Sequence, residues 1–308
     1  MHRGVCLTLP AVVAIAASAT LAQEPVLRDP RLFRSGIEIT SVNATVRDAE
    51  GRLVTGLSRD AFELFEDGER QTITQFTNER VPVSLGVLLD ISDSMFGRRI
   101  RDARAAVERF LFELLDPDDQ YFVMAFNHRP HPLTSWTTTP DIVRHALDRI
   151  RPVGGTAAYD AVIAALPMFT KRSRERAALV IISDGADTAS DGSLRTVHSS
   201  LVRSDAFVYA IAIDSPDRKA INTRVNPTSL QEITDDSGGR TEIVHGSDEL
   251  ADATARIAEE LNSQYLLGYA SPHERDGRYH SIRVRVRGMD YKVRARNGYV
   301  ATPPVNSR

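Results

Sequence analysis

The sequence predicts an α/β fold built on a doubly wound, mostly parallel sheet, with β-rich segments before and after it. Apolar, β-branched runs alternate with helical patterns between residues 81 and 262. The runs are nearly continuous and do not alternate with polar residues, which is typical of strands covered on both faces. Strands that alternate with helices favour a parallel sheet with helices on both sides.

Length and composition exclude several classes of protein. A chain of 308 residues suggests about two domains or one large one, and 42% hydrophobic with 26% charged residues excludes wholesale disorder. Lys and Arg number 38 against 41 Asp and Glu, and this balance argues against a dedicated nucleic-acid binder. The single cysteine, Cys6, excludes an internal disulfide framework and a cysteine-based zinc site.

Residues 1–22 have the pattern of an export signal. His2 and Arg3 precede an apolar run over Val5–Ala19, and small residues up to Ala22 follow. We expect cleavage near Ala22 and export to the periplasm or the extracellular space, with an uncleaved membrane anchor as the alternative. No later run is long and apolar enough to span a membrane, so we expect no transmembrane segment in the mature chain.

The remaining chain divides into three zones. Residues 23–80 form an N-terminal β-rich segment, with a hairpin expected around Asp67-Gly68. Residues 81–262 form the α/β domain. Residues 263–308 form a C-terminal β-rich segment, expected as a three-stranded meander of Tyr265–Tyr269, His280–Arg287 and Tyr291–Arg296. The two β-rich segments together have the size of one small sandwich, and we expect them to pack together.

The α/β domain is expected to alternate strands and helices in order. The strands are Val83–Leu89, Tyr121–Phe126, Ala178–Ile182, Ala206–Ile213 and Thr241–Val244, with an antiparallel edge strand near Pro132–Trp136. The helices are Arg98–Leu115, Asp141–Ile150, Thr156–Phe169, Ser193–Val202, Ser229–Asp235 and Ser247–Leu261.

Strict alternation over Ile282–Arg287 gives one apolar face and one face with three arginines. Such a face is typically solvated. A docking surface for an acidic partner is the alternative interpretation.

The segment Asp90-Ile91-Ser92-Asp93-Ser94 directly follows the first strand of the domain. Ligands of open parallel sheets bind at the carboxyl ends of the strands, so this segment lies where a site is expected. Side chains at its alternate positions, Asp90, Ser92 and Ser94, can point at one spot. Their oxygen atoms suit Mg²⁺, Mn²⁺ or Ca²⁺ rather than copper or zinc.

Two further segments are expected at the same edge. Gly154-Gly155-Thr156 precedes a helix, and Ser183-Asp184-Gly185 ends a second apolar strand. With Thr156 and Asp184 the set becomes two carboxylates and three hydroxyls, and Asp93, Asp160 and Asp187 are expected nearby. Each segment alone is explained by a helix cap or a turn. Their order after successive strands favours a common cation site.

This combination resembles the metal-ion-dependent adhesion site of the von Willebrand factor type A domain family. The resemblance covers about residues 81–262 and includes the run from Gly154 to Ala161. The flanking segments, such as Phe62–Gly68 and Gln264–Tyr269, resemble exported bacterial type A proteins known mainly from acidobacteria.

The resemblance implies a Rossmann-like, doubly wound sheet with one short antiparallel edge. It implies that Ser92, Ser94 and Thr156 ligate a divalent cation through their hydroxyls, and that Asp90 and Asp184 act directly or through water. Mg²⁺ is the expected ion, with Mn²⁺ or Ca²⁺ as alternatives. One open position would accept an exposed Asp or Glu of a protein partner. Asp93 departs from the small residue that the family often has.

Enzyme classes find little support. The nucleophile elbow, the phosphate-binding loop and the dinucleotide-binding glycine motif are all absent from the sequence. A phosphotransferase loop usually has a second acid where this chain has Ser92. His128 and His131 are the only close histidine pair, and we expect them in a solvated turn. The sequence therefore predicts a non-catalytic, exported, cation-dependent adhesion module. The alternatives are a metal-independent structural module of the cell envelope and an accessory unit that positions an enzyme.

Overall fold

The computed structural model describes residues 39–184, 187–213, 227–245, 249–273 and 276–301. The expected export signal and Gly185 lie outside the described residues. Three sheets are present in the described part of the chain, one of six strands and two of four.

The six-stranded sheet is mostly parallel, as the sequence predicts, and has the strand order β10-β9-β8-β5-β6-β7. Its strands are β5 (Val83–Asp90), β6 (Gln120–Phe126), β7 (Pro130–Pro132), β8 (Arg176–Ser183), β9 (Phe207–Ile213) and β10 (Thr241–Val244). All its pairs are parallel except β6 with β7. Every residue of β5, β6, β8 and β9 is buried, which explains why these runs lack a polar alternation.

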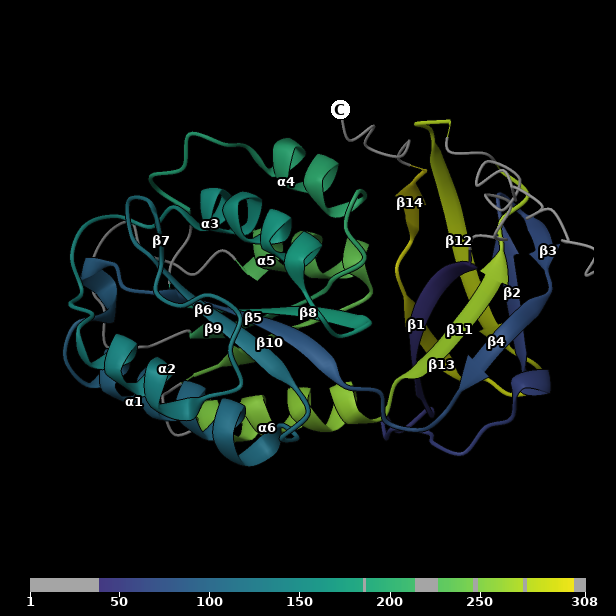
Figure 1. Cartoon of the computed structure of the whole chain (residues 1–308), viewed down its shortest axis with the longest axis horizontal. Helices are drawn as coiled ribbons and strands as arrows, with labels where there is room; N and C mark the ends of the chain where they lie inside the picture. Colours follow the sequence, from purple (N-terminus) through teal and green to yellow (C-terminus); the bar gives the residue numbers. More distant parts are fainter. Residues whose placement is uncertain (1–38, 185–186, 214–226, 246–248, 274–275, 302–308) are drawn as a thin grey trace, which may run out of the picture. The chain divides into compact units, whose positions relative to one another are not determined.

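Helices cover both faces of this sheet (Figure 1). One face carries α1 (Arg98–Arg109), α2 (Pro140–Asp148) and α6 (Leu250–Asn262); the other carries α3 (Ala158–Ala165), α4 (Leu194–Leu201) and α5 (Pro227–Ser237). Two separate hydrophobic clusters result, one for each face. Val87 and Val107 belong to the first cluster, and Leu88 and Val162 to the second.

The helices end earlier than predicted at two places. The expected helix to Leu115 continues from α1 as a π-helical turn, η3 (Phe110–Leu114), and the expected helix to Phe169 becomes the 3₁₀ helix η4 (Leu166–Lys171). Pro167 lies in the first turn of η4. Because a proline has no backbone N–H to donate and its ring crowds the preceding turn, it interrupts the α-helix there.

The predicted position of the edge strand, residues 132–136, is wrong. The edge strand β7 lies earlier in the chain and ends at Pro132.

The two four-stranded sheets contain strands from both flanking segments. One sheet has the order β13-β1-β11-β4, and the other β14-β12-β2-β3. The strands are β1 (Ile39–Arg47), β2 (Phe62–Glu66), β3 (Glu69–Gln71), β4 (Ile73–Thr77), β11 (Tyr265–Ala270), β12 (Tyr279–Val286), β13 (Lys292–Ala295) and β14 (Gly298–Val300). A short 3₁₀ turn, η1 (Arg59–Ala61), precedes β2. Val42 and Leu267 of the first sheet pack in one core with Leu64 and Val284 of the second.

The predicted C-terminal meander is wrong. β11 pairs with β1 and β4, β12 pairs with β2 and β14, and β13 pairs with β1. The hairpin at Asp67-Gly68 is present, but its second arm ends at Gln71 and the chain then enters β4 in the other sheet. Alternation identifies a strand and its inward face, but it does not say which other strand lies beside it.

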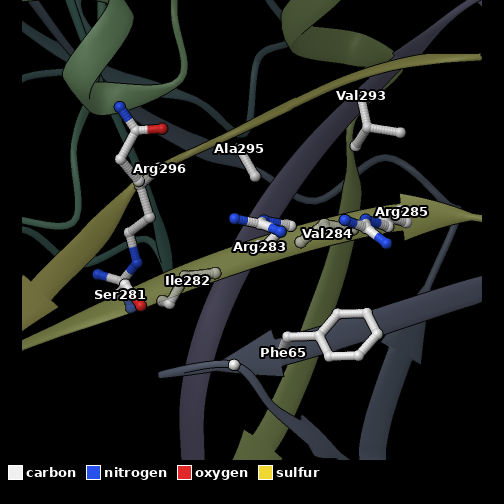
Figure 2. Close-up of a pocket in the computed structure, with 11 residues that line it drawn as sticks. Phe65, Ser281, Ile282, Arg283, Val284, Arg285, Val293, Ala295 and Arg296 are labelled. Carbon is white, nitrogen blue, oxygen red and sulfur yellow. The ribbon is translucent and has the colours of Figure 1, made fainter.

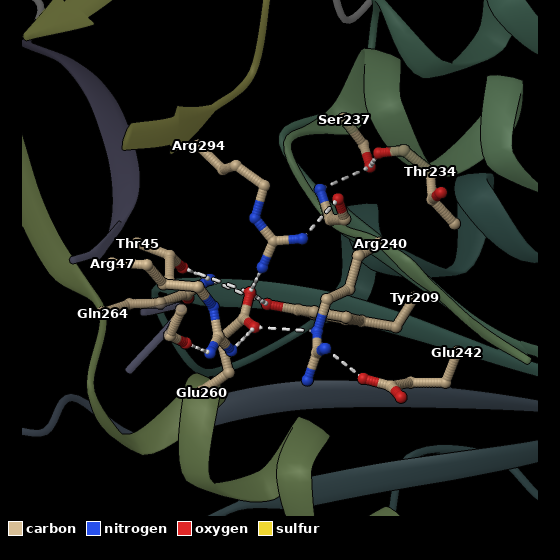
Figure 3. Close-up of polar contacts among 12 residues, drawn as sticks. Thr45, Arg47, Tyr209, Thr234, Ser237, Arg240, Glu242, Glu260, Gln264 and Arg294 are labelled. Carbon is tan, nitrogen blue, oxygen red and sulfur yellow. Dashed lines mark hydrogen bonds and ion pairs between the residues drawn. The ribbon is translucent and has the colours of Figure 1, made fainter. Parts of the chain in front are cut away.

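A buried carboxylate links the α/β domain to the β-rich segments. Glu260 of α6 is fully buried and forms ion pairs with three arginines (Figure 3). Arg47 of β1 lies 2.7 Å from Oε2, Arg240 before β10 lies 3.0 Å from it, and Arg294 of β13 contacts Oε1. The Tyr209 hydroxyl of β9 donates to Oε1 at 3.2 Å. One carboxylate therefore compensates cations from both parts of the chain.

We expect Glu260→Gln to lower the free energy of unfolding by about 3–5 kcal/mol, because removal of one partner leaves buried charges uncompensated. Chemical denaturation measures this change. Glu259→Gln is the matched control, since Glu259 is the exposed neighbour on the same helix, and it should shift stability by no more than about 0.5 kcal/mol. Equal effects of the two substitutions would contradict the role of Glu260.

Candidate functional site

The predicted site lies at the carboxyl edge of the parallel sheet. Asp90 is the last residue of β5, and Asp184 directly follows β8. These strands are parallel neighbours, with Leu89 opposite Ile182, so their ends meet at one edge. After Asp90 the chain turns through a short 3₁₀ segment, η2 (Asp93–Met95), which brings Ser92 and Ser94 back over the strand ends.

Hydrogen bonds connect four of the five predicted residues. The Ser92 and Ser94 hydroxyls lie 2.7 Å apart, and the Ser94 hydroxyl donates to Asp184 Oδ1 at 2.5 Å. Asp90 Oδ1 accepts the backbone N–H of Ser92 at 2.8 Å, and Asp90 Oδ2 accepts the Ser183 hydroxyl at 2.5 Å. The structure thus brings Asp90, Ser92, Ser94 and Asp184 into one polar cluster.

Backbone hydrogen bonds hold the loop before Thr156 at this edge. Two hydrogen bonds of 2.9 Å fasten its loop to the loop after β5, from Val153 N to the Ile91 carbonyl and from Asp93 N to the Gly154 carbonyl. Thr156 itself is 4% exposed. In the described part of the chain, no hydrogen bond joins its hydroxyl to the other four side chains. Three loops therefore meet at one edge. Of the five predicted residues, Thr156 is the one whose hydroxyl forms no hydrogen bond with the others in the described part of the chain.

Gly154 has a structural reason to be a glycine. Its φ is 83°, a left-handed conformation that side chains rarely adopt, and a Cβ there would lie 3.0 Å from His128 Nδ1. The glycine therefore lets the loop turn tightly beside Asp93. The pattern Gly-Gly-Thr has a local structural reason in addition to placing Thr156.

Burial dominates the electrostatics of Asp90. Asp90 is fully buried, and this burial raises its pKa to about 6; the nearby charge of Asp184 acts in the same direction. Hydrogen bonds from Ser183 and Ser92 partly oppose the rise. Two carboxylates in one desolvated cluster repel each other, so the cluster favours a cation nearby.

A positively charged side chain, that of Arg99, contacts this cluster and was not among the predicted site residues. Arg99 Nη1 donates to Asp184 Oδ2 and to the Ser94 carbonyl, both at 2.9 Å. Arg99 lies in the first turn of α1, where a positive charge opposes the helix dipole. A basic residue in that unfavourable position is the signal that could have indicated an acidic partner.

The other acids near the motif have different roles. Asp93 is exposed. Asp160 accepts the N–H groups of Asp191 and Gly192, each at 2.9 Å, and Asp187 accepts that of Tyr159 at 2.9 Å. Asp160 and Asp187 thus connect α3 to the segment before α4, and neither is bonded to the four-residue cluster.

The predicted arginine face of β12 borders a cavity of about 510 Å³ (Figure 2). Arg283 and Arg285 are exposed there, and the Arg285 guanidinium lies 5.7 Å from the centre of the Phe65 ring. Arg287 is an ion-pair partner of Glu63 at 3.0 Å. The face is solvent-exposed, as both interpretations of the sequence require.

The donor set fits a hard divalent cation. Each of the five predicted side chains offers oxygen, and oxygen ligands are those that Mg²⁺, Mn²⁺ and Ca²⁺ prefer. Ser92 and Thr156 are nearly buried, so their hydroxyls have little access to bulk water. A cation could replace the Ser94–Asp184 and Arg99–Asp184 contacts with its own.

Residues 85–186 match the family model of the von Willebrand factor type A domain. The central domain is a von Willebrand factor type A domain. A curated relative, the human inter-alpha-trypsin inhibitor heavy chain H4, is 20% identical over an alignment of 229 residues that covers 69% of this chain and 24% of the relative. The chain thus spans about a quarter of the length of that relative.

A solved structure of a mussel protein shows the same fold. Proximal thread matrix protein 1 from the mussel byssus matches with a TM-score of 0.52 and 16% identity, over 64% of this chain and 51% of that one. BatB from Bacteroides thetaiotaomicron matches with a TM-score of 0.49 and 23% identity, over 58% of this chain and 97% of BatB.

None of the helices in the described part of the chain is long and apolar enough to cross a membrane.

Proposed function

We propose that this protein is an exported, non-catalytic binding module that engages a protein partner through a divalent cation at the type A domain. The cluster of Asp90, Ser92, Ser94 and Asp184 carries the proposal, because four oxygen-bearing side chains from two loops are already connected there. A solved structure of the mussel protein, which matches with a TM-score of 0.51, has zinc in its metal-ion-dependent adhesion site (MIDAS) motif.

Ser92, Ser94 and Thr156 would hold the ion through their hydroxyls, and Asp90 and Asp184 would do so directly or through water. Mg²⁺ is the ion that this donor set favours, with Mn²⁺ or Ca²⁺ as alternatives. When bound, the ion supplies a Lewis-acidic position that attracts the carboxylate of an exposed Asp or Glu of the partner. Asp90 and Ser183 would keep the inner side of the site in place.

The surroundings of the site suit a protein partner. Phe96 is 77% exposed and follows Ser92 and Ser94 in the loop after β5, and Val153 is 55% exposed in the loop before Thr156. Exposed aromatic and aliphatic side chains beside a polar centre are typical of binding surfaces. The exposed Asp93 lies between the two serines, where it would repel an acidic partner and favours a partner with few other acids.

Millimolar Mg²⁺ or Mn²⁺ should raise the melting temperature of the wild-type protein after chelator treatment. An ion at 100 times its Kd adds about 2.7 kcal/mol to stability if it binds only the native state. The double variant Ser92→Ala, Ser94→Ala should show no such shift. Ser199→Ala is the control, since Ser199 is exposed on α4, and it should respond like the wild type. An equal shift in the double variant would overturn the metal proposal.

Arg99→Ala should bind Mg²⁺ about fivefold more tightly than the wild type, because Arg99 competes with the ion for Asp184. Removal of one positive charge beside a partly solvated site is worth on the order of 1 kcal/mol. Isothermal titration calorimetry measures the affinity. Arg98→Ala is the matched control, because the neighbouring Arg98 side chain is 66% exposed and pairs with Asp102. Weaker binding in Arg99→Ala would mean that Arg99 positions the site and does not compete for it.

The partner should be recovered from a cell-envelope extract by the immobilised protein in the presence of Mg²⁺ and released by a chelator. The Ser92→Ala, Ser94→Ala variant should recover none of it, because the ion forms the bridge. Recovery that is unaffected by both the chelator and the variant would support the alternative, a metal-independent structural or assembly module of the envelope.

A further inference from the structure

Two histidines and an aspartate meet in the β-rich part of the structure, and none of the three is among the predicted site residues. Asp67 lies in the turn between β2 and β3, His273 follows β11, and His280 lies in β12. One ligand atom from each of the three lies within 4.8 Å of the others. Sequence reasoning missed this group because Asp67 and His280 are 213 residues apart.

The aspartate presents one oxygen to both imidazoles. Asp67 Oδ2 lies 2.7 Å from His280 Nδ1 and 3.4 Å from His273 Nε2. Its other oxygen, Oδ1, accepts the backbone N–H of Ser281 at 2.7 Å and the Ser281 hydroxyl at 3.1 Å. The carboxylate is therefore held in place on one side, while Oδ2 faces the two rings. The rings are stacked, with centres 4.1 Å apart, so both rings can direct a nitrogen lone pair at one ion only when the exposed His273 ring rotates out of the stack.

A second carboxylate orients His280. Its Nε2 lies 3.3 Å from Asp276 Oδ1. In the neutral ring whose Nε2–H donates to Asp276, Nδ1 carries no proton and can bind a metal. Histidine ligands of metals usually donate their other N–H to a carboxylate in this way. Burial lowers the pKa of His280, but the hydrogen bonds to Asp67 and Asp276 outweigh it and raise the pKa overall.

We propose that Asp67, His273 and His280 form a second metal site, which binds Zn²⁺ or a similar divalent transition ion. Asp67 Oδ2, His273 Nε2 and His280 Nδ1 are the ligands, and Asp276 is a positioning residue. The His280 Nδ1 proton passes to solvent when the ion binds. Three protein ligands leave at least one position for water or for a donor from another molecule.

The chemistry of the donors separates this site from the one in the type A domain. Imidazole nitrogen suits zinc, copper, nickel and iron, whereas hydroxyl and carboxylate oxygens suit Mg²⁺ and Ca²⁺. Access also differs within the new site. The side chains of Asp67 and His273 are 37% and 38% exposed, while that of His280 is 6% exposed. An ion can therefore enter from solvent and reach an inner ligand whose position is fixed by packing.

The test uses the full chain without a polyhistidine tag, stripped of metal, in the Ser92→Ala, Ser94→Ala background, so that only the second site remains. Calorimetric titration with zinc chloride should show one site per chain, which millimolar Mg²⁺ does not displace. His273→Ala should weaken zinc binding at least tenfold. Asp276→Asn should weaken it by about 10–100-fold, as expected for a residue that orients a ligand.

His145→Ala is the matched control, because His145 is an exposed histidine on α2, and it should leave zinc binding unchanged. The melting temperature in chelator should be the same with and without His273→Ala, since that side chain is substantially exposed, so a loss of binding would not reflect misfolding. Failure to bind zinc in the Ser92→Ala, Ser94→Ala background, or binding that survives both His273→Ala and Asp67→Asn, would overturn the proposal. Neither result depends on the type A site.

Discussion

Burial of a parallel sheet on both faces leaves only its strand ends for polar chemistry. In this protein every residue of four adjacent strands is buried, and the helices on both faces exclude solvent from the sheet. Polar side chains of this sheet that could meet an ion or a partner therefore lie at the strand ends, and here they lie where β5 and β8 end. The positions of Asp90 and Asp184 follow from this constraint, and the turn η2 then adds the two serines.

Burial also requires that charges inside the protein compensate one another, as they do around Glu260. Glu260 is fully buried and is surrounded by Arg47, Arg240 and Arg294. Each arginine comes from a different strand or its flank, so the ion pairs fix how α6 lies against β1 and β13. Burial of an ion pair gains little free energy over an apolar contact, but loss of one partner is strongly destabilising. The network therefore acts mainly to select one arrangement.

The two candidate metal sites use different ways of holding a ligand in place. In the type A domain, short contacts among Ser92, Ser94 and Asp184 bring oxygen atoms together, and Arg99 partly compensates their charge. In the β-rich part, packing around His280 and the hydrogen bonds of Ser281 to Asp67 fix two of three ligands. By the chemistry of the donor atoms, the first proposed site favours a hard ion and the second a borderline one.

The sequence by itself determined the class of the fold, the parallel strands of the α/β domain and the segments that meet at the strand ends. These properties depend on local patterns: continuous apolar runs, helical periodicity and polar residues directly after a strand. Only the tertiary structure decided which β-strands pair, because alternation fixes the inward face of a strand and not its neighbour. It also brought Arg99 to Asp184, and Asp67 to His273 and His280. Contacts between residues far apart in the chain leave no local pattern, so they emerge only from the packing of the whole fold.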